Sequence, residues 1–285
     1  MISKDSLQML IEKNKLTGHI LIIIILYLLQ GYIHAFKISI PLFLASYKAS
    51  WQQQGTFSWV SYPFSFKILW APIIESIYND RFGRYLTWLL PIQTIVGLIL
   101  VTLSFYLESL LVNLQIVTLT IIYSIVYFLI ASQDIVVDGW SVAIFASSNL
   151  QWASTCQTLG QDIGYFLGST VLMTLESSNF TNRYIRQPLS FTVRPYGLVS
   201  LEQFTFFWGI LFLVVSIMLL VIFFPRKVSK RSSKRVQLTL DLSETYLAIV
   251  KLFGKQCMRK LALILLTFDV GFAATNYMTN LTLLE

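Results

Sequence analysis

Long apolar runs separated by shorter polar segments make up most of the chain. Seven runs are long enough to cross a bilayer, which takes about 20 apolar residues per helix. They are Gly18–Ala45, Thr56–Tyr78, Leu86–Leu107, Leu114–Ala146, Trp152–Leu175, Phe204–Phe224 and Leu261–Leu281. Membrane-spanning β-strands need only about 9–11 residues, so runs of this length predict helices. The pattern therefore predicts an all-α, polytopic membrane protein.

The composition agrees with this prediction. The chain is 55% hydrophobic and only 12% charged, which is about half the charged share of soluble domains. Aromatic residues make up 15% of it, as is typical of helices anchored at both membrane interfaces. The net charge of +7 comes from basic residues that lie mostly between the apolar runs. We therefore expect the lipid bilayer as the surroundings, and no nucleic-acid partner.

The distribution of Lys and Arg predicts the orientation, because cytosolic loops are enriched in both. With a cytosolic N-terminus, the cytosolic segments hold five basic residues before residue 225 and ten within Pro225–Lys260, against four on the opposite side. The count favours this orientation. The segment Ser177–Gln203, with Arg183, Arg186 and Arg194, then lies on the opposite side and runs against the trend.

Six apolar runs, a long basic segment and one further run suggest part of a two-bundle protein. We predict a cytosolic tail over 1–17, a six-helix bundle over 18–224, a basic cytosolic linker over 225–260, and the first helix of an incomplete second bundle over 261–285. This layout resembles the major facilitator transporters, in which two six-helix halves surround a central cavity. A complete seven-helix protein is the alternative.

Three carboxylates lie within the apolar runs. Asp134 and Asp138 are four residues apart, so they share one face of a helix. Asp162 follows in the next run. A charge at bilayer depth costs about 3 kcal/mol on insertion scales and normally faces a polar cavity or a partner. We therefore predict that these residues form ion pairs or carry protons along a solute path.

Two lysines are candidate partners of these carboxylates. Lys37 lies about midway in the first run, and Lys67 lies between Pro63 and Pro72 in the second. Proline interrupts the helical hydrogen bonds and leaves carbonyls free to bind a neighbour or a solute. Each lysine either captures an anionic solute, makes a structural ion pair with Asp134 or Asp138, or extends its ammonium to the membrane interface. His34, one turn before Lys37, could join the same cavity.

A short charged loop follows the second run. Asp80, Arg81, Gly83 and Arg84 form the pattern D-R-x-G-R, which is similar to a loop signature of the major facilitator superfamily. The glycine permits a tight turn. Arginines at the membrane surface can bind carboxylates or helix C-termini and hold one gated state closed. A simple positive-inside anchor is the alternative.

The fifth run carries a stripe of small residues. Gly160, Gly164 and Gly168 recur every four residues, so they lie on one helix face. Such a stripe lets two helices approach closely. We expect it to serve helix packing, with sliding between the halves of a transporter as the alternative.

Several of these segments together resemble the acetyl-coenzyme A transporters of the endoplasmic reticulum membrane, a branch of the major facilitator superfamily. The most specific motif is Gln133-Asp134-Ile135-Val136-Val137-Asp138-Gly139-Trp140. The other matching stretches are Leu29–Gly31, Pro63–Pro72, Phe82–Arg84, Ala153–Cys156, Gly160–Gln161, Gly164–Gly168 and Phe206–Gly209. The resemblance covers nearly the whole chain. It implies alternating-access transport of acetyl-CoA from the cytosol into the lumen of the endoplasmic reticulum.

The chemistry of acetyl-CoA fits side chains in these segments. Its phosphates need cations, and its adenine ring needs aromatic faces. The predicted cavity residues are Lys37, Lys67, Trp70, Tyr62 and Trp140. The aspartates would repel phosphates, so we expect them to hold the lysines in place or to take up protons.

Other functions stay open. A proton-coupled permease for another large solute, similar to the bacterial muropeptide permeases, would use the aspartates as proton sites. The truncated second half favours a non-transporting membrane scaffold. A membrane acetyltransferase would need a histidine such as His34 at depth, and we expect no enzymatic activity. Cys156 and Cys257 match no metal or redox spacing, so no metal or cofactor is expected. The sequence leaves a homo-oligomer open.

Overall fold

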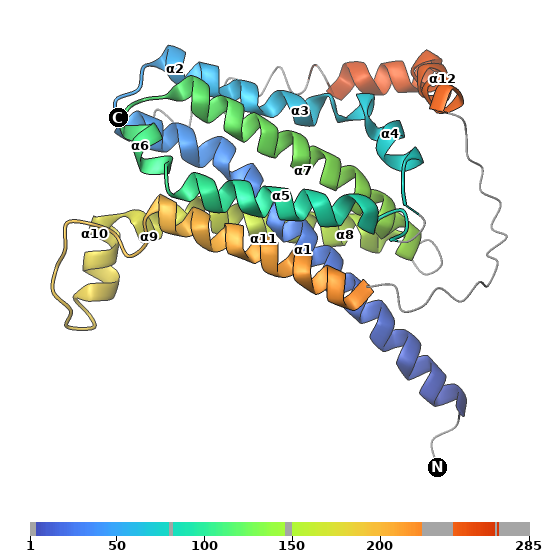
Figure 1. Ribbon diagram of the computed structural model, residues 1–285, viewed down its shortest axis with the longest axis horizontal. Helices are drawn as coiled ribbons and strands as arrows, with labels where there is room; N and C mark the ends of the chain where they lie inside the picture. Colours follow the sequence, from blue (N-terminus) through green and yellow to red (C-terminus); the bar gives the residue numbers. More distant parts are fainter. Residues whose placement is uncertain (1–3, 80–81, 146–149, 224–241, 266, 268–285) are drawn as a thin grey trace.

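The computed structural model describes residues 4–79, 82–145, 150–223, 242–265 and 267. Every element within these ranges is helical (Figure 1). Four helices are long and apolar enough to cross a membrane. They are α1 (Lys4–Ser46), α5 (Leu86–Ser104), α7 (Ile116–Phe145) and α11 (Leu201–Phe223). The prediction of an all-α polytopic membrane protein is confirmed.

The second apolar run is not one helix, as the sequence predicted over Thr56–Tyr78. It is divided into five short helices with turns at Phe66 and Trp70. These are α2 (Trp51–Phe57), η1 (Ser58–Ser61), α3 (Tyr62–Ser65), η2 (Lys67–Leu69) and α4 (Ala71–Ser76). Pro63 and Pro72 lie in the first turns of α3 and α4, where the missing N–H is tolerated. Each proline therefore begins a new helix in this segment.

The fifth run is helical throughout but changes its winding. α8 (Gln151–Phe166) continues into the π-helix η3 (Leu167–Val171) and then α9 (Leu172–Glu176) without a non-helical residue. At the π-helix, the Ser39 hydroxyl of α1 donates to the Gly168 carbonyl at 3.0 Å. A π-helix inserts an extra residue into the turn and shifts the faces that follow. The side chains of α9 are therefore rotated about the helix axis relative to the faces that α8 presents.

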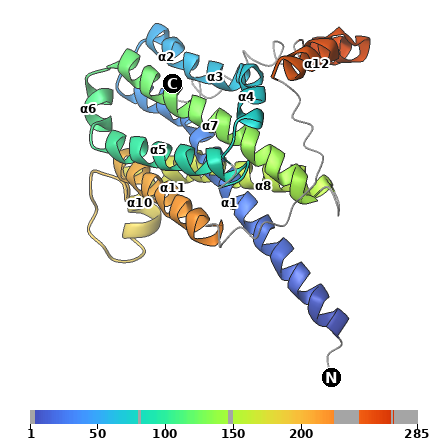
Figure 2. The same ribbon diagram turned by 45° about the vertical axis from the view of Figure 1, so that its right-hand side comes forward.

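Two close helix pairs and α7 form the core of the bundle. α1 packs along α8, and α5 packs along α11, while α7 contacts both pairs (Figures 1 and 2). Tyr32 of α1 stacks on Trp208 of α11, with ring centroids 4.2 Å apart. A Cβ atom on Gly97 of α5 would lie 3.0 Å from the Gly209 carbonyl oxygen of α11. A Cβ atom on Gly209 would in turn lie 2.9 Å from the Val101 backbone nitrogen of α5, so both glycines permit the close approach of these two helices.

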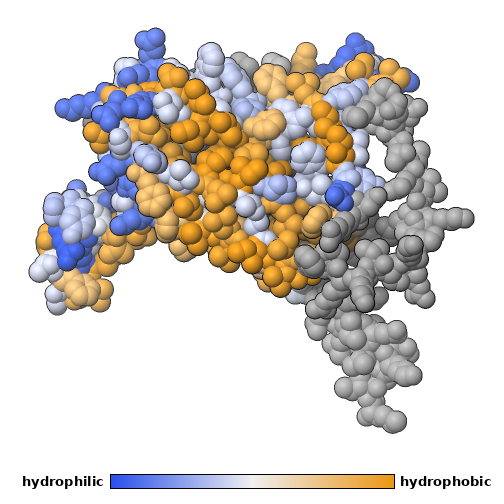
Figure 3. All heavy atoms as spheres, viewed as in Figure 1, coloured by the Kyte–Doolittle hydropathy of each residue, from blue (hydrophilic) through white to orange (hydrophobic). Residues whose placement is uncertain are grey.

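Short helices lie at the end of the bundle opposite the N-terminus (Figure 1). They are α6 (Leu107–Val112), α10 (Ser178–Thr181) and the π-helix η4 (Asn182–Arg186). The remainder of the bundle surface between the ends is largely apolar, as Figure 3 shows for the face in view. Side chains on α11 such as Phe207, Ile217 and Val221 are 59%, 61% and 71% exposed. This apolar exposure is expected for a surface in contact with lipid.

The predicted basic linker contains a helix that the sequence interpretation missed. α12 spans Leu242–Gly254, and residues 256–265 are helical as well. α12 packs against α4, and the Tyr246 hydroxyl donates to the Leu69 carbonyl at 2.6 Å. Residues 225–241 and most of the predicted seventh helix, Leu261–Leu281, lie outside the described residues. The predicted basic linker is therefore helical in the described part of its second half, where the side chains are mostly exposed.

Candidate functional site

An ion pair lies inside the bundle between the broken second segment and α7. Lys67 Nζ donates a hydrogen bond to Asp134 Oδ2. The Asp134 side chain is 1% exposed, whereas the Lys67 side chain is 33% exposed. The carboxylate is thus sequestered, and its cation still has access to the surroundings. An unpaired carboxylate at this depth would be unfavourable, so Lys67 stabilises the charged form of Asp134.

The second carboxylate of the motif has its own donors. The Tyr27 hydroxyl of α1 donates to Asp138 Oδ1 at 2.7 Å, and Gln157 Nε2 of α8 donates to the same oxygen at 3.2 Å. Asp138 therefore lies one helical turn from Asp134 without sharing its cation. The two carboxylates face the interior between α1, α7 and α8.

Amide side chains extend the network, and the sequence interpretation overlooked them. Gln161 Nε2 lies 3.5 Å from Asp134 Oδ1 and 3.3 Å from Gln30 Oε1. Gln157 and Gln161 are four residues apart on α8, just as Asp134 and Asp138 are on α7. The matching i, i+4 spacing of polar residues in two neighbouring apolar runs was the signal that could have identified them.

Aromatic side chains line the approach to Lys67. The Lys67 ammonium lies 4.7 Å from the centroid of the Phe64 ring, within cation–π range. The His34 ring of α1 packs edge-on against Phe64 at 4.7 Å. Lys67 and His34 thus contact the same Phe64 ring, and Lys37 follows His34 by three residues, about one turn of α1. Trp70 Nε1 donates to the Ser132 hydroxyl at 3.1 Å, which fixes the indole against α7.

Three residues predicted for the site lie elsewhere. Tyr62 is 53% exposed and contacts the rings of Trp59 and Phe66. Trp140 is buried between Tyr85 and Phe223. Two positions separate it from Asp138, which turns it about 200° around the helix axis. Asp162, next to Gln161, is exposed on α8. None of the three has a described contact with Lys67.

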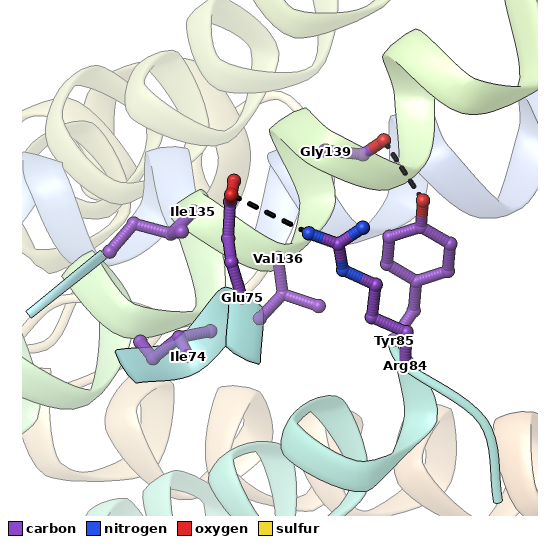
Figure 4. A pocket seen from close by; sticks show the side chains of 7 residues that line it. All are labelled: Ile74, Glu75, Arg84, Tyr85, Ile135, Val136 and Gly139. Atoms are coloured by element: carbon purple, nitrogen blue, oxygen red, sulfur yellow. Dashed lines mark hydrogen bonds and ion pairs between the residues drawn. The ribbon is translucent and has the colours of Figure 1, made fainter. Parts of the chain in front are cut away.

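The other end of the second segment carries the predicted gating loop. Asp80 and Arg81 lie outside the described residues. Gly83 has a φ of 81°, in the left-handed region that glycine adopts readily. Arg84 Nη2 lies 3.5 Å from Glu75 Oε2, and Figure 4 shows the two side chains pointing toward each other.

Next to this ion pair, Tyr85 joins the same loop to α7. Its hydroxyl donates to the Gly139 carbonyl at 3.3 Å, as Figure 4 shows. A cavity of about 190 Å³ lies between the loop, α4 and α7. Partial burial of the Tyr85 phenol raises its pKa, so it stays a neutral hydrogen-bond donor at physiological pH. The loop is therefore tied to the helix that carries both carboxylates.

The glycine stripe of α8 faces α1. A Cβ atom on Gly164 would lie 2.0 Å from the Leu28 carbonyl oxygen, and one on Gly160 would lie 2.6 Å from Tyr27 Cβ. On α1, a Cβ atom on Gly31 would lie 2.1 Å from the Gln161 carbonyl oxygen. These contacts leave no space for a side chain. They bring Tyr27 and Gln161 to the carboxylates of α7.

The arrangement of Lys67, Asp134 and Asp138 has the chemistry to hold an anion or a proton. Among the described residues, no group of three His, Cys, Asp or Glu side chains is placed to bind a metal ion. Cys156 and Cys257 are both free thiols. A partly accessible cation, aromatic rings and two protonatable carboxylates within a membrane-spanning bundle are features of a membrane transporter.

The comparisons with known proteins define the family. The sequence profile described as acetyl-coenzyme A transporter 1 matches residues 19–234. The chain belongs to this family of membrane transporters. This match confirms the family that the sequence motifs predicted.

Two fungal relatives match along nearly the whole chain. An uncharacterized membrane protein of Saccharomyces cerevisiae is 31% identical over 93% of the chain and 54% of its own length. An uncharacterized protein of Schizosaccharomyces pombe is 31% identical over 100% of the chain and 53% of its own length. The chain therefore spans about half the length of these relatives.

A more distant relative is a bacterial permease. The anhydromuropeptide permease of Escherichia coli is 27% identical over 121 residues, which is 42% of this chain and 24% of the permease. No solved structure matches the chain significantly.

Proposed function

We propose that the protein carries acetyl-CoA across the endoplasmic reticulum membrane, from the cytosol to the lumen, by alternating access. The chain would form the first half of a major facilitator fold, with a second half completing the path. The observation that carries the proposal is the ion pair of Lys67 with Asp134 in a chain of this family.

The unequal exposure of the two partners suggests how the site would work. Because a third of the Lys67 side chain is accessible while Asp134 is buried, an incoming phosphate can reach the ammonium and replace the carboxylate. The Phe64 ring over Lys67 and the Trp70 indole beside it offer surfaces for the adenine ring. Asp134, released from its cation, would then become a proton acceptor.

The experiment is binding of radiolabelled acetyl-CoA to the purified chain, followed by uptake into liposomes. We expect saturable binding that free coenzyme A and adenosine 3′,5′-bisphosphate compete for, because both present phosphates. Acetate and acetylcarnitine are the controls, and neither should compete. If neither coenzyme A nor adenosine 3′,5′-bisphosphate lowers acetyl-CoA binding, Lys67 is not a phosphate site.

A proton-coupled permease for another large solute is the second candidate. It is favoured by the similarity to the anhydromuropeptide permease and by Asp138, whose donors Tyr27 and Gln157 leave it without a cation. Uptake measured with and without an imposed pH gradient separates the candidates. Gradient-driven uptake that Asp138→Asn abolishes, with no response to acetyl-CoA, would favour the permease.

A further inference from the structure

The segment between α9 and α11 is folded around a buried arginine. Arg186 is 6% exposed and donates to Asn182 Oδ1 at 2.8 Å, to the Tyr196 carbonyl at 2.6 Å and to the Gly197 carbonyl at 2.8 Å. Asn182 Nδ2 in turn donates to the Arg194 carbonyl at 2.7 Å. These bonds join the two arms of the segment, so its tip is presented in a fixed position.

This fixed tip exposes apolar side chains. Leu189, Phe191 and Val193 are 61%, 64% and 62% exposed, and Tyr184 and Tyr196 are 59% and 57% exposed. Exposed aliphatic and aromatic groups on so short a segment need an apolar partner. Tyrosine in particular is enriched at the level of lipid headgroups.

The charge of the segment is entirely positive. Arg183 and Arg194 are exposed, and the sequence has no Asp or Glu between Glu176 and Glu202. Each exposed guanidinium lies over a tyrosine ring, with Arg183 at 5.5 Å from the Tyr184 centroid and Arg194 at 5.6 Å from the Tyr196 centroid. Paired arginine and tyrosine side chains fit an anionic group at an apolar boundary.

The position of the segment identifies its partner. It begins where α9 ends at Glu176 and finishes where α11 begins at Leu201, so it lies at the membrane surface. In both views it projects past α11, on the side of the bundle away from α3, α4 and α12 (Figures 1 and 2). The neighbouring α11 exposes apolar side chains such as Phe207, Ile217 and Val221, as expected of a surface in contact with lipid. Phospholipid is therefore the expected partner on this side.

We propose that residues 177–200 form an interfacial lipid anchor. Leu189, Phe191 and Val193 enter the boundary between headgroups and acyl chains, and Arg183 and Arg194 bind lipid phosphates. This also accounts for two of the three arginines on the predicted non-cytosolic face, where basic residues are usually depleted. The third, Arg186, serves the fold of the segment.

The test uses the full chain in phosphatidylcholine nanodiscs, with Cys257→Ser removing the exposed thiol. Bimane on Phe191→Cys should be quenched by headgroup-proximal doxyl lipid and protected from aqueous iodide. Bimane on Gln52→Cys, at an exposed polar site of α2, is the control and should respond to iodide alone. Iodide quenching of the Phe191→Cys label without lipid quenching overturns the proposal, and so does protection from both quenchers, which would mean that the label is buried against protein.

A second arm tests the arginines. With bimane on Phe191→Cys, we expect doxyl-phosphatidylglycerol to quench at least about two-fold more than doxyl-phosphatidylcholine, because the guanidinium groups attract anionic lipid. Arg183→Gln with Arg194→Gln should remove this excess while Arg186 keeps the segment folded. Equal quenching by the two lipids in the parent chain, or an excess that survives both substitutions, overturns the phosphate contact.

Discussion

At the scale of single residues, Lys67 has two separable roles: it neutralises a buried carboxylate and it is the proposed solute contact. We predict that Lys67→Ala lowers acetyl-CoA binding at least about ten-fold and destabilises the bundle by about 3 kcal/mol, because Asp134 keeps a charge without a cation. Equilibrium binding and thermal unfolding in detergent measure the two effects. Lys251→Ala, on the exposed surface of α12, should change neither.

A double variant separates the two roles. Lys67→Ala with Asp134→Asn removes both charges, so we predict that stability recovers most of its loss while binding stays weak. Recovery of binding together with stability would mean that Lys67 acts only as a structural partner. The double-mutant cycle isolates the pair because each single change removes the same interaction.

The sequence identified the charged residues of the site but not their partners. Lys67 and the carboxylates were predictable, because charges in apolar runs are costly and must face something polar. The pairing of Lys67 with Asp134 was not predictable, because the rotation and packing of the helices decide which lysine meets which carboxylate. Trp140 shows the limit: it is the last residue of the specific motif, yet it points to another face of α7. The amides of α8 were hidden because uncharged side chains carry a weaker signal.

At the scale of elements, the contact of α1 with α8 is the tightest constraint. We predict that Gly164→Leu destabilises the bundle by about 1–3 kcal/mol or more, because its side chain would displace the Leu28 carbonyl and separate the two helices. Gly55→Leu is the matched control, since Gly55 is exposed and a Cβ atom there has nothing within 4 Å. Thermal unfolding in detergent compares the two, and equal midpoints would contradict the close contact.

The attachment of α12 to the second segment includes a hydrogen bond from the Tyr246 hydroxyl to the Leu69 carbonyl. Ile73 N bonds to the Trp70 carbonyl, so the Leu69 carbonyl takes the Tyr246 hydroxyl instead. We predict that Tyr246→Phe costs about 1 kcal/mol of docking free energy, which raises amide hydrogen exchange in α12 about five-fold and leaves α7 unchanged. Unchanged exchange in α12 would show that apolar packing alone holds this helix.

The lengths of the long helices were predictable from the apolar runs. The exact breaks within the second run and the helix in the linker were not predicted. The prolines in the second run indicated breaks, although only the backbone shows that the segment becomes five short helices. In the linker, the spacing of Leu242, Tyr246, Ile249 and Phe253 follows the helical period. The short apolar pattern follows a strongly basic, polar stretch, and such a stretch by itself indicates a solvated loop and not a helix.

At the scale of the whole molecule, the orientation in the membrane is a prediction that labelling can check. In sealed endoplasmic reticulum vesicles, an impermeant maleimide should label Cys257 from outside, because the linker is predicted to be cytosolic. With Cys257→Ser as background, Gln52→Cys should be labelled only after the vesicles are permeabilised. Labelling of both sites in intact vesicles would contradict the predicted topology.

The contact of α1 with α8 has a mechanical consequence. Where backbone touches backbone along several turns, the two helices cannot slide or tilt separately, so any access cycle has to move them as one body. The divided segment from α2 to α4 has no such restriction, because its hydrogen bonds already change partner at every proline and turn. If a solute passes Lys67, as proposed, we expect the segment from α2 to α4 to bend while α1 and α8 keep their relative positions.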